Sequence, residues 1–172
     1  MMSVGGTSWK EGDGANPIAW SGSGGGFAWQ FAQPAHQKAA VGQYLSSTSG
    51  LPPPSSYNAS GRGYPDLSAV AVMGTSESSP TVAGIFSMLM DHRLNAGLKP
   101  LGFLAPRLWQ TMAAHPGVAL ENIGTGDSKT SCDNGFPASK SGWDPVTGWG
   151  RPKWAGLLQL FGSDDTLTPT AA

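Results

Sequence analysis

The sequence is poor in charge, in cysteine and in long apolar runs, and each shortage excludes a class of protein. Only 12% of its 172 residues are charged and the formal net charge is −1, so it lacks the basic character that binds nucleic acid or an anionic membrane. No apolar run approaches the roughly 18 residues of a membrane span, and the first residues lack the apolar core of a signal peptide. The single cysteine, Cys132, cannot form a disulfide within the chain, and we interpret it as a free thiol in a polar loop.

Glycine and proline, in contrast, are abundant. The chain has 25 Gly and 14 Pro, with seven Trp among them, and the absence of a collagen-like period indicates a loop-rich globular domain. We predict one domain over residues 1–162 and a disordered tail over 163–172. The glycine-rich run 21–27 predicts a backbone that approaches another segment closely or needs positive φ.

Strands are expected to alternate with helices. Residues 1–32 favour short strands and turns, and 67–73 favours a buried strand. Apolar residues at helical spacing predict four helices, at 34–45, 80–95, 106–115 and 153–161. Because apolar residues surround most of the circumference of 80–95, we expect this helix to be central and buried, with Gly97 as its C-cap. The alternation predicts an α/β sandwich with parallel strands.

The most informative local feature is the serine-rich segment between the predicted strand and the helix at Pro80. A serine at a sharp strand-to-helix turn projects its hydroxyl from the scaffold, and the backbone N–H groups at the helix start lie where an oxyanion would form. Gly74 permits the tight turn. The same residues could instead be an ordinary helix start with Ser79 as N-cap. Local sequence leaves both interpretations open.

The string TSESSPTVAG at 75–84 resembles the nucleophile segment shared by subtilisin-like peptidases and the sedolisins, the serine-carboxyl peptidase family that includes tripeptidyl-peptidases. Further stretches resemble sedolisins and not subtilisins: SGGGF at 23–27 with PAHQ at 34–37, LPP to GYPD at 51–66, LGFLAPRL at 101–108 and GWDPVTGWG at 142–150. The resemblance covers residues 3 to about 161. It implies that Ser76 is the nucleophile, supported by Gly74 and Thr75 at the oxyanion turn.

The resemblance implies the C-terminal portion of a subtilisin-like three-layer sandwich with a mostly parallel sheet. The family activity is acid-acting hydrolysis of peptide or protein substrates through an acyl-enzyme, in secreted or lysosomal proteins. Its base is a glutamate oriented by an aspartate four residues later, and a further aspartate serves the oxyanion hole. No Glu-x-x-x-Asp occurs in this sequence. We therefore expect the N-terminal half of the catalytic domain to be missing and this chain to be inactive alone.

Two alternatives remain open, a non-catalytic pseudo-peptidase that binds peptides and a subtilisin-like hydrolase with a histidine base. The histidines are His36, His92 and His115, and we expect none of them to reach Ser76. Asp66 is expected to be structural or near the substrate cleft. Only residues 67–73 separate Asp66 from Gly74, whereas family members usually hold a longer stretch there.

The resemblance also implies one calcium site near the C-terminal end. Its ligands are an aspartate, the next carbonyl, two more backbone carbonyls and a final aspartate, all of them oxygen donors that suit a hard cation. The matching residues are Asn122, Ile123, Lys140, Gly142 and Asp144. Asparagine stands where the family has the first aspartate, so one negative charge is lost and the affinity should fall. The alternative is that both segments are ordinary turns.

Overall fold

The computed structural model describes residues 1–10, 13–129 and 134–164. Cys132 and residues 165–172 of the predicted tail lie outside the described residues. The strands are β1 Val4–Lys10, β2 Asp13–Ala19, β3 Gly26–Ala32, β4 Gly61–Tyr64, β5 Leu67–Val70, β6 Leu120–Glu121 and β7 Arg151–Pro152. The helices are α1 Lys38–Ser47, α2 Thr75–Asn95, α3 Leu104–Ala114 and α4 Trp154–Phe161, with the short 3₁₀ helices η1 Ala35–Gln37 and η2 Pro54–Ser56.

The strands form three small sheets and not one parallel sheet. β1 lies between β2 and β5, β3 pairs with β4, and β6 pairs with β7. Among the described residues, β1–β5 is the parallel pair, and the other ladders are antiparallel. β1 and β2 are joined by a short connection, which permits only antiparallel pairing, whereas β5 reaches β1 after a long connection that contains α1 and can therefore pair parallel. The mixed α/β class is confirmed, and the mostly parallel sheet is not seen in this part of the chain.

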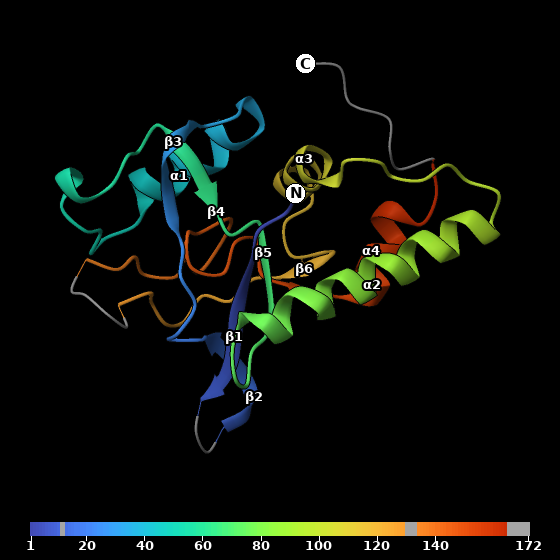
Figure 1. Cartoon of the computed structure of the whole chain (residues 1–172), viewed down its shortest axis with the longest axis horizontal. Coiled ribbons are helices and arrows are strands. Elements are labelled where there is room, and N and C mark those ends of the chain that lie inside the picture. Colours follow the sequence, from blue (N-terminus) through green and yellow to red (C-terminus); the bar gives the residue numbers. More distant parts are fainter. Residues whose placement is uncertain (11–12, 130–133, 165–172) are drawn as a thin grey trace.

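Three of the four predicted helices occur close to their expected positions (Figure 1). In α3 the expected inner face is buried, with Leu108, Trp109 and Met112 each at most 1% exposed. His115 is the C-cap of this helix, as expected from the proline that follows it. α3 and α4 carry a clear apolar stripe, which is why sequence periodicity located them.

The start of α2 differs from the prediction. The helix begins at Thr75 and not at Pro80, and its N-cap is Gly74 with φ of 149°, so Ser79 is not the cap. Pro80 therefore lies inside the helix, where it has no N–H to donate to the carbonyl of Ser76 four residues earlier. The helix tolerates this loss because only one hydrogen bond near its end is affected.

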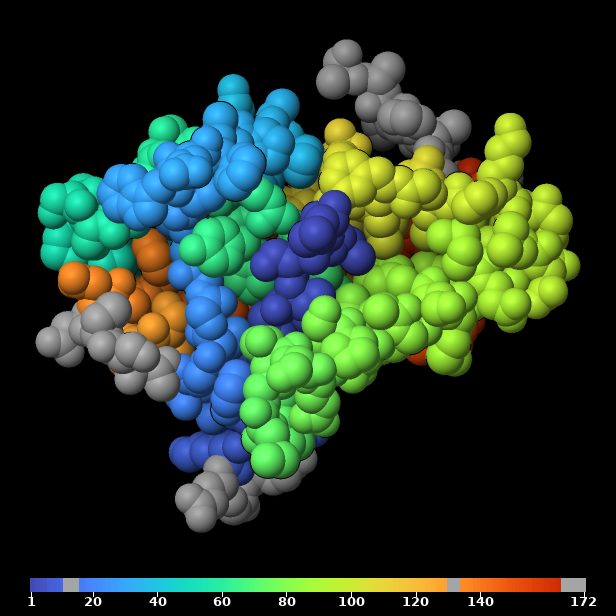
Figure 2. Space-filling view, in the orientation of Figure 1, coloured from blue at the N-terminus to red at the C-terminus, as the bar shows by residue number. Residues whose placement is uncertain are grey.

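The burial of α2 also corrects the prediction of a central helix. Its buried residues form one stripe, Ser78, Val82, Leu89 and Arg93. Met88 is 60% exposed and Leu94 is 55% exposed. Figure 2 shows α2, in green, lying across one face of the molecule. Apolar side chains surround most of α2, but the described residues cover only one side of the helix.

The C-terminal end of α2 agrees with the sequence. Gly97 has φ of +74°. Its N–H bonds to the carbonyl of Leu94, and the N–H of Leu98 bonds to the carbonyl of Arg93. This pair of hydrogen bonds is the Schellman motif, which needs a residue in the left-handed conformation. The C-cap itself is Ala96, and Gly97 is the left-handed residue that follows it.

The core is built around aromatic side chains from distant parts of the sequence. The Trp143 ring centroid lies 5.2 Å from that of Trp109 and 5.9 Å from that of Tyr44. The indole N–H of Trp143 donates to the carbonyl of Pro65 at 2.8 Å. The motif at 142–150 is thereby packed against α1, α3 and the segment that leads into β5.

Candidate functional site

Ser76 lies in the first turn of α2, directly after a very short connection from β5. The strand ends at Val70, and the predicted strand 67–73 is thus shorter by three residues. Val72 and Met73 in the connection are 69% and 92% exposed. Ser76 is itself exposed. Its hydroxyl is placed at the positive end of a 21-residue helix, where free backbone N–H groups favour a negative charge.

Two neighbours of Ser76 tie the start of α2 to β5. The hydroxyl of buried Ser78 donates to the carbonyl of Val70 at 2.9 Å, and the carboxylate of Glu77 accepts the N–H of Val72 at 2.8 Å. The sequence reasoning missed both contacts. A glutamate at the third helical position commonly reaches back to an N–H before the helix, and this signal could have indicated the Glu77 contact. Glu77 takes that position only if the helix begins at Thr75.

The three histidines are far from Ser76 or engaged elsewhere. His92 lies on α2, 16 positions after Ser76 (92 − 76), which corresponds to about 24 Å along the helix axis. His115 caps the far end of α3, and the ring of His36 lies 6.1 Å from that of Trp109. In the described ranges no hydrogen bond joins a histidine to Ser76. The prediction that no histidine reaches it therefore agrees with these positions.

Asp66 is a buried structural group. Its side chain is 0% exposed. One carboxylate oxygen accepts the Ser3 N–H and an Arg62 N–H, both at 2.7 Å, and the other accepts the indole N–H of Trp109 at 2.7 Å. This carboxylate joins the residue before β1 to β4 and α3, which is a role in folding and not that of a base.

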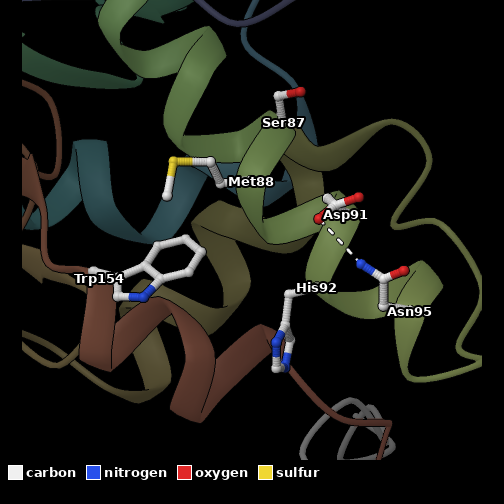
Figure 3. Close-up of a pocket in the computed structure, with 6 residues that line it drawn as sticks. All are labelled: Ser87, Met88, Asp91, His92, Asn95 and Trp154. Carbon is white, nitrogen blue, oxygen red and sulfur yellow. Dashed lines mark hydrogen bonds between the residues drawn. The ribbon is translucent and has the colours of Figure 1, made fainter.

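A surface hollow of about 550 Å³ lies between α2 and α4, away from Ser76. Figure 3 shows its lining, Ser87, Met88, Asp91, His92, Asn95 and Trp154. Ser87, the nearest of the α2 residues in this set, is 11 positions from Ser76 (87 − 76), or about 16 Å along the axis. Asn95 uses its amide to donate to Asp91 at 3.1 Å. The hollow is therefore separate from the candidate nucleophile.

The candidate calcium ligands come from two segments that lie side by side. The Asn122 side-chain amide donates to the carbonyl of Gly142 at 2.9 Å. The hydroxyl of Thr147 approaches the carbonyl of Ile123 at 3.5 Å. A Cβ on Gly124 would lie 2.8 Å from the Cα of Lys140. The structure thus brings together the two segments that the sequence singled out, although they are about 20 residues apart.

Asp144 is the one carboxylate among these five residues, and it is already hydrogen-bonded. One oxygen accepts the N–H groups of Val146 and Thr147 at 2.9 and 2.7 Å, and the other accepts that of Ser139 at 2.9 Å. Burial raises the pKa of Asp144 to about 6, although these backbone hydrogen bonds oppose the shift. Among the described residues no three His, Cys, Asp or Glu side chains gather into a metal-binding group. The Asn122 side chain turns an amide N–H, and not its oxygen, towards the Gly142 carbonyl. With Asp144 as the one carboxylate, these residues as placed do not fit Ca²⁺, which takes about 6–8 oxygen ligands.

His36 predicts a pH dependence of stability. Burial lowers its pKa below the ordinary 6.5; Asp66 opposes this shift and Arg62 adds to it. Between the two pKa values the unfolded chain binds more protons, so this contribution is present above 6.5 and is lost as the pH falls. We expect the unfolding free energy of the wild type, relative to His36→Gln, to decrease on acidification from about pH 8 to about pH 5. Urea titrations of both proteins across this pH range measure the difference in their unfolding free energies. A difference that does not change with pH would contradict the prediction.

None of the described helices combines the length and the apolar character that crossing a membrane requires. This finding agrees with the absence of long apolar runs in the sequence.

The sequence is similar to several known proteins. No family model matches the sequence. The chain is 45% identical over 159 residues to Tripeptidyl-peptidase 1 of Canis lupus familiaris, covering 81% of this chain and 27% of that protein. It is 44% identical over 187 residues to the protein of that name from Rattus norvegicus and 42% identical over 181 to that from Homo sapiens, in each case covering 94% of this chain and 31% of the relative.

The chain spans about three tenths of the length of these relatives, 27–31%. The rat alignment extends over 187 positions, more than the 172 residues of this chain, so the relative has residues without a counterpart here. With 42–45% identity along most of its length, the chain belongs to the sedolisin family of serine-carboxyl peptidases and corresponds to the C-terminal part of their catalytic domain.

Proposed function

We propose that this chain carries the nucleophile of a serine-type peptidase, that Ser76 is that nucleophile, and that the whole enzyme removes tripeptides under acid conditions. The observation that carries the proposal is the 42–45% identity to Tripeptidyl-peptidase 1. The position of Ser76 supports it, since an exposed serine at a helix N-terminus is placed for nucleophilic attack.

In this mechanism the Ser76 oxygen attacks the carbonyl carbon of the scissile peptide bond and its proton passes to a carboxylate base. The negative charge that develops on the carbonyl oxygen is stabilised by N–H groups at the start of α2, around Gly74 and Thr75. The carbon–nitrogen bond then breaks, the amine leaves with a proton, and water hydrolyses the acyl-enzyme. The base is supplied by a part of the catalytic domain that precedes the residues matched here.

The proposal includes the architecture of the complete domain. The sheet β2-β1-β5 would extend into the mostly parallel sheet of a three-layer sandwich. The exposed side of α2, with Met88 and Leu94 uncovered, would pack against the remaining part. We extend the proposal to a secreted or lysosomal location, where an acid-acting peptidase finds its working pH.

A non-catalytic pseudo-peptidase is the second candidate, and one observation favours it. The connection between β5 and α2 is short, and the carboxylate of Glu77 is held there by the Val72 N–H at 2.8 Å. A negative charge one residue after Ser76 opposes the formation of an oxyanion at this helix end. A protein of this kind would bind peptides without cleaving them.

Ser76→Ala separates the two candidates. In the product of the complete open reading frame, we expect this change to lower the rate of tripeptide release from an unblocked oligopeptide at acid pH by at least about 10⁴-fold. Ser79→Ala is the matched control, because Ser79 is exposed in the same helical segment, and it should retain activity. If the unmodified protein binds the peptide without releasing tripeptides, the pseudo-peptidase is the correct function.

A further inference from the structure

Segments 122–124 and 139–147, which we call the clasp, lie against each other. Their contact is made by polar groups that connect residues about 20 positions apart in the sequence. Asn122 donates its amide N–H to the Gly142 carbonyl at 2.9 Å, and Thr147 approaches the Ile123 carbonyl at 3.5 Å. Close backbone packing at Gly124 brings the segments to within van der Waals contact. The clasp is thus held by side-chain to backbone contacts across its gap.

The Asn122 side chain points its amide nitrogen, and not its oxygen, at the Gly142 carbonyl. A cation within the clasp would need an oxygen of Asn122 turned towards the Gly142 carbonyl, because cations bind oxygen lone pairs. The structure places the amide nitrogen there, and its N–H carries the partial positive charge that attracts the carbonyl oxygen. The amide N–H therefore makes with the Gly142 carbonyl oxygen the favourable electrostatic contact that a cation would otherwise make.

The Asp144 carboxylate has hydrogen-bond donors on both of its oxygens. Three backbone N–H groups, from Ser139, Val146 and Thr147, point at its two oxygens. The Thr147 hydroxyl lies 3.3 Å from both oxygens as well. These donors already offset the buried negative charge and fix the turn that carries Gly142, so the turn keeps its shape without an ion.

We propose that the clasp closes without a metal ion, and that the amide of Asn122 takes the place that a calcium ion would have if residue 122 were an aspartate. This inference does not depend on whether Ser76 is catalytic. It concerns how the C-terminal segments are held together, and it makes the stability of this protein independent of calcium.

Thermal unfolding with excess Ca²⁺ or with a chelator tests the proposal, with Mg²⁺ at the same concentration as a control for ionic strength. For the wild-type chain we expect the Tm to be unchanged by Ca²⁺. Asn122→Asp removes the amide donor and adds a carboxylate facing the Gly142 carbonyl. Its Tm should fall in the chelator and rise by about 5 to 10 °C with saturating Ca²⁺. Calorimetric titration should show Ca²⁺ binding to Asn122→Asp and none to the wild type.

Asn122→Leu is the matched control, since it has a similar volume and neither donor nor charge. Its Tm should fall by roughly 2 to 4 °C for one lost hydrogen bond, whether or not Ca²⁺ is present. Ca²⁺ binding by the wild type with a rise in Tm would overturn the proposal. It would equally be overturned if Asn122→Leu were as stable as the wild type, or if Asn122→Asp failed to respond to Ca²⁺.

Discussion

Asp66→Ala is expected to destabilise the protein by about 3–5 kcal/mol, a large fraction of the roughly 5–15 kcal/mol that stabilises an ordinary domain. The change leaves three donors without their acceptor, the Ser3 N–H, the Arg62 guanidinium and the Trp109 indole N–H. The indole and the carboxylate are both buried, so water cannot replace the lost bonds cheaply. Urea unfolding followed by tryptophan fluorescence and far-UV circular dichroism measures the effect.

The matched control is Asp91→Ala, an exposed carboxylate on α2 whose partner is the amide of Asn95. Surface changes of this kind usually alter the free energy of unfolding by no more than about 0.5 kcal/mol. Asp66→Asn should lie between the two variants, because its amide oxygen can still accept but its amide nitrogen would face a donor. Similar stabilities for Asp66→Ala and Asp91→Ala would show that the buried network is not important for folding.

Gly25→Ala is expected to be the second very damaging change. A Cβ at this position would lie 1.9 Å from the carbonyl oxygen of Pro145 and 2.9 Å from its carbon. These are backbone atoms in the motif at 142–150, so no side-chain rotation relieves the overlap. We expect a loss of about 3 kcal/mol or more, at the upper end of the range for overpacked sites.

Gly24→Ala is the control, because a Cβ there meets no heavy atom within 4 Å. The two variants add the same methyl group to neighbouring residues and differ only in what that group contacts. Thermal or urea unfolding of both should give a large loss for Gly25→Ala and little change for Gly24→Ala. Equal losses would mean that backbone freedom in the glycine run matters more than the approach to Pro145.

Local patterns in the sequence located the features that depend on neighbouring residues. Apolar spacing indicated α3 and α4, and Gly97 indicated the end of α2, because both signals act within one or two helical turns. The glycine run 21–27 indicated a close approach, although not that Pro145 would be the partner. The ordered motifs around Ser76 were sufficient to identify the family, since they are strings of adjacent residues.

Long-range contacts settled what these patterns left open. The start of α2 at Thr75 is held by the hydrogen bond of Ser78 to the end of β5 and by that of Glu77 to Val72 in the connection, whereas local propensity alone placed the start at Pro80. Its apolar circumference did not mean a central helix, because burial depends on what packs against each side and not on the helix sequence. The amide of Asn122 likewise faces Gly142 only because folding brings 122 and 142 together. Contacts between residues distant in the sequence depend on the path of the whole chain, and no local pattern encodes that path.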